Sequence, residues 1–100
     1  MDQRFYKRHK QNYDCDILYK DVKYRCHVMN SSSEGFMLRL SIIEGFNCND
    51  SIVIYVDTYL DGQHIQLSYE LSVKHMSFYY DKYMVIGCHI ERLLEDFVVA

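Results

Sequence analysis

The stretch at residues 65–74 reads IQLSYELSVK, and its pattern decides the fold class of the chain. Its odd-numbered positions are apolar or aromatic, whereas its even-numbered positions are polar or charged. Successive side chains of a β-strand point to opposite faces, so a period of two is typical of a strand with one buried face. The stretch therefore predicts a strand that separates a core from solvent.

The same alternation recurs on both sides of this stretch. Residues 14–19 and 22–28 alternate in the same way and are separated by only two residues, which predicts a tight hairpin. Further strands are expected at residues 36–42, 52–56 and 83–90. Residues 91–98 instead suggest a helix, because Leu94 and Phe97 are three positions apart. These elements predict an all-β fold, a six-stranded antiparallel β-barrel with a short C-terminal helix.

The composition is that of one small globular domain. The chain has 100 residues, of which 49% are hydrophobic and 25% charged. Its apolar runs are far shorter than the ~20 residues that span a bilayer, and no secretory signal is apparent. We therefore expect a cytoplasmic protein without membrane insertion. The four cysteines are widely spaced, which favours free thiols over disulfides.

The charge is distributed unevenly along the chain. Residues 1–10 carry four basic side chains and one acidic one, a net of +3, whereas residues 11–100 carry 7 basic and 13 acidic ones, a net of −6. The two parts add to the total of −3. We therefore expect a flexible basic arm at residues 1–12 and a barrel at residues 13–100. The acidic barrel disfavours a long nucleic acid as a partner.

The sequence contains two short motifs, the first in the basic arm and the second after the predicted hairpin. Arg4 and Arg8 form an Arg-x-x-x-Arg pair in the arm, and Asn30, Ser32 and Gly35 form an Asn-x-Ser-x-x-Gly after the predicted hairpin. Taken alone, the first is more often a solvated tail and the second a polar turn. Together, with an alternating strand after Gly35 and with a Val-Ile-Gly-Cys segment at residues 85–88, they resemble the PilZ domain family over nearly the whole chain.

This resemblance implies a barrel that binds the bacterial second messenger cyclic di-GMP. Arg4 and Arg8 would wrap around the ligand, while Asn30, Ser32 and Gly35 would hold it at the barrel surface. The chemistry of the side chains agrees, because an arginine can bind a phosphate through two hydrogen bonds or pair with guanine O6 and N7. No cofactor besides this ligand is expected. The family's signalling role implies an unidentified effector protein as a second partner.

Other functions have less support in the sequence. The serines at residues 31–33 lack a nucleophile motif, so we expect no enzymatic activity. Cys26-His27 and Cys88-His89 are adjacent pairs on predicted strands, so neither pair can chelate a metal through both side chains. One alternative is an interaction module that keeps the barrel without binding nucleotide. A weaker alternative is a barrel that binds single-stranded nucleic acid through the basic arm and exposed tyrosines.

Overall fold

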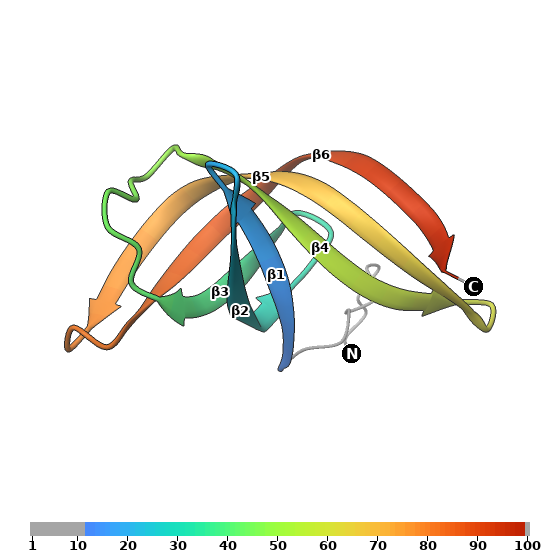
Figure 1. Ribbon diagram of the computed structural model, residues 1–100, viewed down its shortest axis with the longest axis horizontal. Coiled ribbons are helices and arrows are strands. Elements are labelled where there is room, and N and C mark those ends of the chain that lie inside the picture. The colour runs from blue at the N-terminus through green and yellow to red at the C-terminus, as the bar shows by residue number, and fades with distance from the viewer. Residues whose placement is uncertain (1–11, 100) are drawn as a thin grey trace, which may run out of the picture.

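Six strands form one sheet that closes on itself (Figure 1). The structure is a computed structural model that describes residues 12–99, and the side chains of residues 60 and 95–99 lie outside the description. The strands are β1 (Tyr13–Tyr19), β2 (Val22–Ser31), β3 (Gly35–Ser41), β4 (Ser51–Leu60), β5 (Gln63–Tyr79) and β6 (Tyr83–Val99). Each of the six predicted strands is therefore confirmed, and most of them are longer than the sequence pattern indicated.

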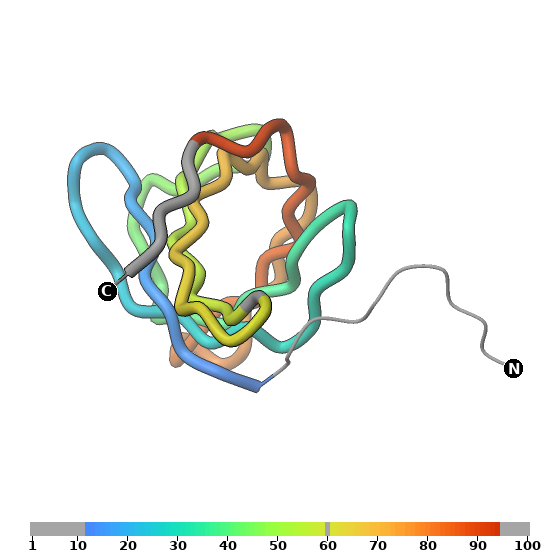
Figure 2. The backbone as a smooth tube through the Cα atoms, turned by 90° about the vertical axis from the view of Figure 1, so that its right-hand side faces the viewer, coloured from blue at the N-terminus to red at the C-terminus, as the bar shows by residue number. Residues whose placement is uncertain are grey.

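The strands are antiparallel throughout and follow the order β1-β2-β3-β6-β5-β4 around the barrel. The closed ring is visible when the barrel is turned by 90° (Figure 2). The long strands β5 and β6 pair with each other along almost their entire length. Closure leaves few free sheet edges, which is how a small all-β protein limits unwanted strand pairing.

Tight turns connect the hairpins. Lys20 and Asp21, between β1 and β2, both have positive φ angles of 51° and 64°. Asp61 and Gly62 repeat this arrangement between β4 and β5, with φ angles of 52° and 80°. Positive φ at both central residues is what a type I′ turn requires, and that turn matches the twist of the paired strands. The predicted tight hairpin between residues 19 and 22 is confirmed.

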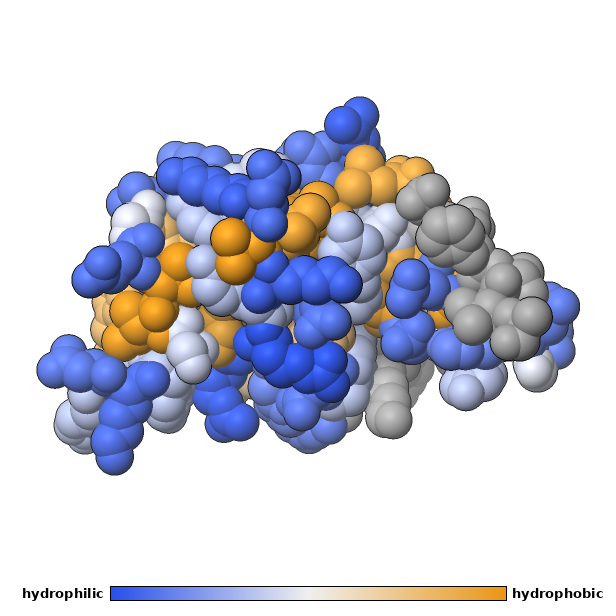
Figure 3. Space-filling view, in the orientation of Figure 1, coloured by the Kyte–Doolittle hydropathy of each residue, from blue (hydrophilic) through white to orange (hydrophobic). Residues whose placement is uncertain are grey.

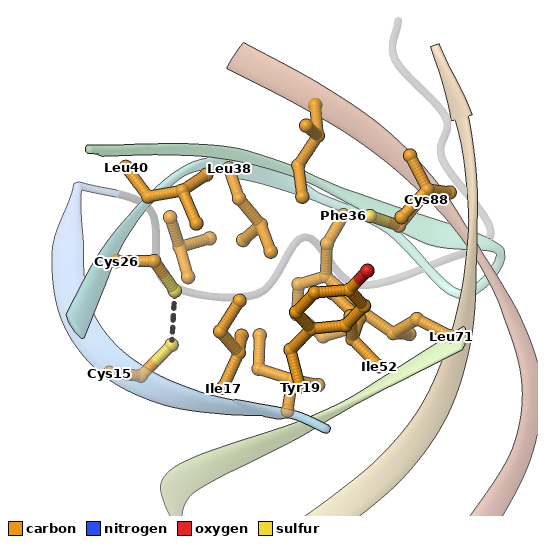
Figure 4. Close-up of a cluster of buried hydrophobic side chains, with 14 of the residues drawn as sticks. Cys15, Ile17, Tyr19, Cys26, Phe36, Leu38, Leu40, Ile52, Leu71 and Cys88 are labelled. Carbon is orange, nitrogen blue, oxygen red and sulfur yellow. Dashed lines mark hydrogen bonds between the residues drawn. The ribbon is translucent and has the colours of Figure 1, made fainter. Parts of the chain in front are cut away.

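The inward positions of all six strands meet in one hydrophobic core (Figure 4). Its fully buried side chains include Ile17, Val28, Leu38, Ile52, Ile54, Leu71, Val73, Met84 and Ile86. Cys15 and Cys26 oppose each other on β1 and β2 with their sulfur atoms 3.5 Å apart, and all four cysteines are free. The hydrogen bond to Cys15 and burial raise the pKa of Cys26. Both side chains are buried and pack as small apolar core residues.

The predicted helix at residues 91–98 is wrong, because this segment continues strand β6. It pairs with β5, for example Arg92 with Glu70 and Leu93 with Tyr69. The register skips Glu91 and Leu94, so two bulges lie three residues apart on β6. These bulges break the period of two and imitate helical spacing. Residues 12–99 contain no helix, and so none that could cross a bilayer.

The connection between β3 and β4 folds back over one end of the barrel. Phe46 is buried and lies edge-on to the ring of Tyr19, with 4.7 Å between ring centroids. Asp50 accepts hydrogen bonds from the Tyr19 hydroxyl at 2.8 Å and from the backbone N–H of Asn47 at 2.8 Å. Asn49 N–H donates to the carbonyl of Val73 on β5 at 2.7 Å. This connection is therefore a fixed part of the barrel wall.

Candidate functional site

An open pocket of about 350 Å³ lies on the outer wall of the barrel. This volume falls within the ~300–1,000 Å³ typical of small-molecule sites. One side is made by the end of β2, the β2–β3 turn and the start of β3, and the other side by the middle of β5 and β6. The lining residues are Asn30, Ser31, Ser32, Glu34, Gly35, Phe36, Met37, Lys74, His75, Gly87, Cys88 and His89.

A β-bulge on β2 determines which way Asn30 faces. Val28 pairs with Leu38 but Asn30 pairs with Met37, so Met29 is an extra residue in the ladder. Without the bulge, Asn30 would face inward like Val28, two positions earlier. With it, Asn30 is exposed and Ser31 is buried. The bulge therefore places Asn30 at the pocket and is of the kind that re-aims side chains near functional sites.

The turn after β2 presents Ser32 beside Asn30. The Ser32 hydroxyl oxygen accepts a hydrogen bond from the backbone N–H of Glu34 at 3.1 Å, and the Ser32 N–H donates to the Gly35 carbonyl at 3.0 Å. The turn is thus held by one backbone hydrogen bond and by one hydrogen bond to the Ser32 hydroxyl. Because a hydroxyl accepts and donates independently, the O–H of Ser32 remains able to donate to a ligand.

Gly35 is needed for the packing of β3 against β6. A Cβ atom at this position would lie 2.1 Å from the carbonyl oxygen of Cys88. The same approach lets the N–H of Ile90 donate to the Glu34 carbonyl at 2.8 Å. The close approach at Gly35 is to the backbone of β6, and the predicted role of Gly35 in ligand binding stays a prediction. Gly35 therefore brings the two sides of the pocket together.

A second bulge builds the opposite side of the pocket. Val73 pairs with Cys88 and His75 with Gly87, so Lys74 is an extra residue on β5. As a result Lys74 and His75, consecutive in sequence, are both exposed, while Val73 is buried. The ring of His75 lies over Gly87, where a Cβ atom would come within 3.4 Å of its Cδ2. The imidazole of His75 therefore packs closely against the backbone of β6 at Gly87.

The pocket is lined by side chains that can donate hydrogen bonds and by the thiol of Cys88. Lys74, His75 and His89 line the β5–β6 side, and Glu34 is the one acidic residue among those that line it. Burial raises the pKa of Cys88 to about 12, so its thiol is protonated at neutral pH. A protonated, buried thiol is a poor nucleophile. Cys88 is therefore not suited to act as a nucleophile in this pocket.

A second hollow of about 300 Å³ lies over β1, β2, β3 and β6. Its charged groups already have partners: His27 Nδ1 lies 2.8 Å from Asp14 Oδ1, and Arg25 lies 3.1 Å from Asp16. The guanidinium of Arg39 lies over the ring of Tyr83, 5.6 Å from its centroid. A ligand would have to displace these contacts, so the first pocket is the better candidate site.

Three of the five predicted site residues meet in this pocket. Asn30, Ser32 and Gly35 lie together on its β2–β3 side, whereas Arg4 and Arg8 lie outside the described residues. The sequence interpretation missed Lys74, His75 and His89 on the other side. A signal was present, because Lys74 and His75 are two polar residues in succession after a strict alternation. That signal also fits the end of a strand, and only the register identifies it as a bulge.

Comparison with known proteins agrees with this geometry. The chain is a closed six-stranded antiparallel β-barrel with an open pocket on its wall. The family model for the PilZ domain matches residues 2–99, so the chain belongs to the PilZ domain family. PilZ domains are binding and adaptor modules, and the family implies cyclic di-GMP and protein effectors as the kinds of partner.

One solved structure is similar in fold, that of the Bacillus subtilis Inhibitor of motility (MotI/DgrA). The match has a TM-score of 0.71 and 16% sequence identity, and it covers 94% of this chain and 45% of that one. The chain thus spans less than half the length of that protein, and the likeness shows the fold alone. No curated protein matches the chain.

Proposed function

We propose that this chain is an adaptor that binds cyclic di-GMP in the pocket between the β2–β3 turn and strands β5 and β6. In this proposal the basic arm at residues 1–12 closes over the bound nucleotide, and a protein partner recognises the closed form. Membership in the PilZ domain family supports the ligand class. The pocket lined by Asn30, Ser32 and Gly35 supports the proposed location of the binding site.

The observation that carries the proposal is the bulge at Met29. It turns Asn30 outward next to Ser32, so that both motif side chains line the same pocket. A bulge costs ladder hydrogen bonds, and bulges are over-represented at sites where a side chain must be re-aimed.

The chemistry of cyclic di-GMP suits these groups. The ligand offers two phosphates and two guanines. The Asn30 amide can accept from the N–H groups of guanine and donate to an acceptor, and the Ser32 hydroxyl can donate to a phosphate oxygen. In the proposed complex Arg4 and Arg8 supply forked hydrogen bonds to phosphate or to guanine O6 and N7. The arm carries a net charge of +3, which favours an anionic ligand.

Signalling would follow from the position of the arm. A ligand shifts a conformational equilibrium only by its difference in affinity for the two states. Contacts from Arg4 and Arg8 exist only when the arm lies over the nucleotide, so the nucleotide favours that state. The partner would then recognise a surface formed jointly by the arm, the ligand and the barrel.

Isothermal titration calorimetry tests this proposal. The wild-type protein is titrated with cyclic di-GMP, with GTP and with a short single-stranded oligonucleotide, and the Arg8→Ala and Lys10→Ala variants are titrated with cyclic di-GMP. We expect selective binding of cyclic di-GMP that Arg8→Ala weakens by about 2–5 kcal/mol, the cost of removing one partner of a desolvated charged pair. Lys10→Ala, which removes one charge from the same arm outside the motif, should retain most of the affinity.

Absence of binding at tens of micromolar, or an equal loss for both variants, would contradict the proposal. The first result would favour the second candidate function, a nucleotide-independent interaction module. One surface favours that candidate: at the β5–β6 hairpin Phe78 and Tyr80 are 57% and 89% exposed, and the rings of Tyr79 and Tyr83 stack 5.2 Å apart. Exposed aromatic residues are frequent in protein interfaces.

A further inference from the structure

We infer that Lys74, flanked by His75 and His89, is a second phosphate-binding position on the side of the pocket formed by β5 and β6. This inference rests on the proposed function and adds to it a ligand contact outside the two motifs. It assigns one phosphate of the cyclic dinucleotide to Lys74.

The bulge on β5 presents this group of side chains. In a regular strand, Lys74 and His75 would point to opposite faces of the sheet. The register shift between Val73 and His75 puts both on the outer face, where they line the pocket together with His89 from β6. Two bulges, at Met29 on β2 and at Lys74 on β5, therefore each supply one side of the same pocket.

The backbone around Lys74 is held firmly by the β3–β4 connection. The Cys48 thiol lies 3.7 Å from the Lys74 carbonyl. Val73 exchanges backbone hydrogen bonds with the same connection, accepting from Asn49 at 2.7 Å and donating to Asp50 at 3.0 Å. A binding group is most effective when rigid elements position it in advance, because less ordering is then required on binding.

The electrostatic surroundings leave the ammonium group of Lys74 available. Among the described side chains, those of residues 12–59 and 61–94, no carboxylate forms an ion pair with it. The nearby Glu91 accepts a hydrogen bond of 2.6 Å from the Ser72 hydroxyl. That bond, with smaller contributions from His89 and Lys74, lowers the pKa of Glu91, so it remains ionised. Glu34 lines the β2–β3 side of the pocket, across from Lys74.

The geometry of the ligand matches two separated cationic positions. The two phosphates of a cyclic dinucleotide lie on opposite sides of its ring, so one group cannot neutralise both. A lysine is a compact point charge that suits phosphate, whereas the amide of Asn30 suits a base edge. We therefore assign Lys74 to a phosphate and the two imidazoles to supporting hydrogen bonds.

The Lys74→Gln variant tests this inference. Calorimetric titration with cyclic di-GMP compares the wild type, Lys74→Gln, Lys74→Arg and the control Lys82→Gln, which removes an exposed charge in the β5–β6 turn outside the pocket. We expect Lys74→Gln to weaken binding by about tenfold, equivalent to about 1.4 kcal/mol. Lys74→Arg should retain most of the affinity and Lys82→Gln nearly all of it. Thermal unfolding verifies that each variant is folded.

The salt dependence gives a second readout. Loss of a phosphate contact should make the affinity of Lys74→Gln less sensitive to sodium chloride than that of the wild type, because exposed charge pairs are screened. Wild-type affinity in Lys74→Gln, while Arg8→Ala still loses binding, would overturn this inference and leave the proposed function intact. Failure of the wild type to bind cyclic di-GMP would overturn both.

Discussion

Ser31 carries a buried hydroxyl group with no hydrogen-bond partner. Its side chain is 4% exposed, and it is the only buried side-chain oxygen or nitrogen without a partner among the described residues. The bulge at Met29 turns Ser31 inward in the same step that turns Asn30 outward. Placing Asn30 at the pocket therefore puts a polar group into the core.

We predict that Ser31→Ala stabilises the protein. Removing an unsatisfied buried hydroxyl should gain about 1 kcal/mol, the lower part of the desolvation cost of such a group. For a domain of this size 1 kcal/mol corresponds to a rise in Tm of roughly 4–8 °C. Thermal unfolding followed by circular dichroism measures it.

Ser33→Ala is the matched control, because Ser33 is exposed in the turn that follows. Its Tm should stay within a degree or two of the wild type, since exposed substitutions have small effects. A clear loss of stability in Ser31→Ala would show that the hydroxyl has a partner in solution, and the account of the bulge as a costly feature would then be wrong.

The sequence was least informative about which face of the sheet a single side chain points to. The alternation of the predicted strand ends at Val28, so it gives no orientation for Asn30. A bulge depends on hydrogen bonding between two strands, so it leaves no local mark in one of them. The motif could therefore name Asn30, Ser32 and Gly35 from the sequence, but not the bulge that presents them.

At the scale of elements, the strands were predictable because each has one buried face. The C-terminal segment was misjudged because the bulges at Glu91 and Leu94 replaced alternation by a spacing of three. A helix of eight residues is marginal by itself, since isolated helices below ~12–15 residues are barely stable in water. Strand β5 provides backbone hydrogen-bond partners for the segment at residues 91–98. The segment therefore pairs with β5 as a strand instead of forming a helix.

The β3–β4 connection leads to a pH-dependent prediction. The backbone N–H of Asn47, and then the hydroxyl of Tyr19, lower the pKa of Asp50 below its usual value of 3.8. A lowered folded-state pKa adds stability above the unfolded-state value, and that stability is lost as the pH falls through the folded-state value. Tyr19→Phe should therefore lower Tm at pH 7 by an amount on the order of a few degrees.

The difference in Tm between the wild type and Tyr19→Phe should shrink below pH 3.8, where Asp50 becomes protonated. Tyr24→Phe is the control, because the half-buried Tyr24 packs against the core. Thermal unfolding at several pH values from neutral to acidic tests this. A Tm difference that is independent of pH would mean that the stabilisation by the Tyr19 hydroxyl does not depend on the charge of Asp50.

At the scale of the whole molecule, the uneven charge relates the sequence to the proposed function. A net of +3 on residues 1–10 and −6 on residues 11–100 disfavours a long polyanion, which would have to cross the acidic barrel. On the face shown in Figure 3, hydrophobic residues reach the surface among hydrophilic ones. A compact ligand between the arm and the pocket avoids most of the acidic surface.

The barrel class and half of the pocket could be predicted from the sequence, and the other half could not. Asn30, Ser32 and Gly35 form a local motif, so they can be identified from a short segment. Lys74 and His89 lie on separate strands, and nothing in the sequence indicates that they face this motif. Only the closure of the sheet, with β3 paired to β6 and β6 to β5, brings them to it.

Amide NMR spectra of the isotope-labelled protein, recorded during titration with cyclic di-GMP, test the central claim most directly. The account predicts that the largest shift changes map to residues 30–35, 74–75 and 87–89, on both sides of one pocket. The Lys20–Asp21 turn, far along β1 and β2 from this pocket, should remain unchanged. Shift changes centred on the hollow around Arg25 and Arg39, or no changes at all, would contradict it.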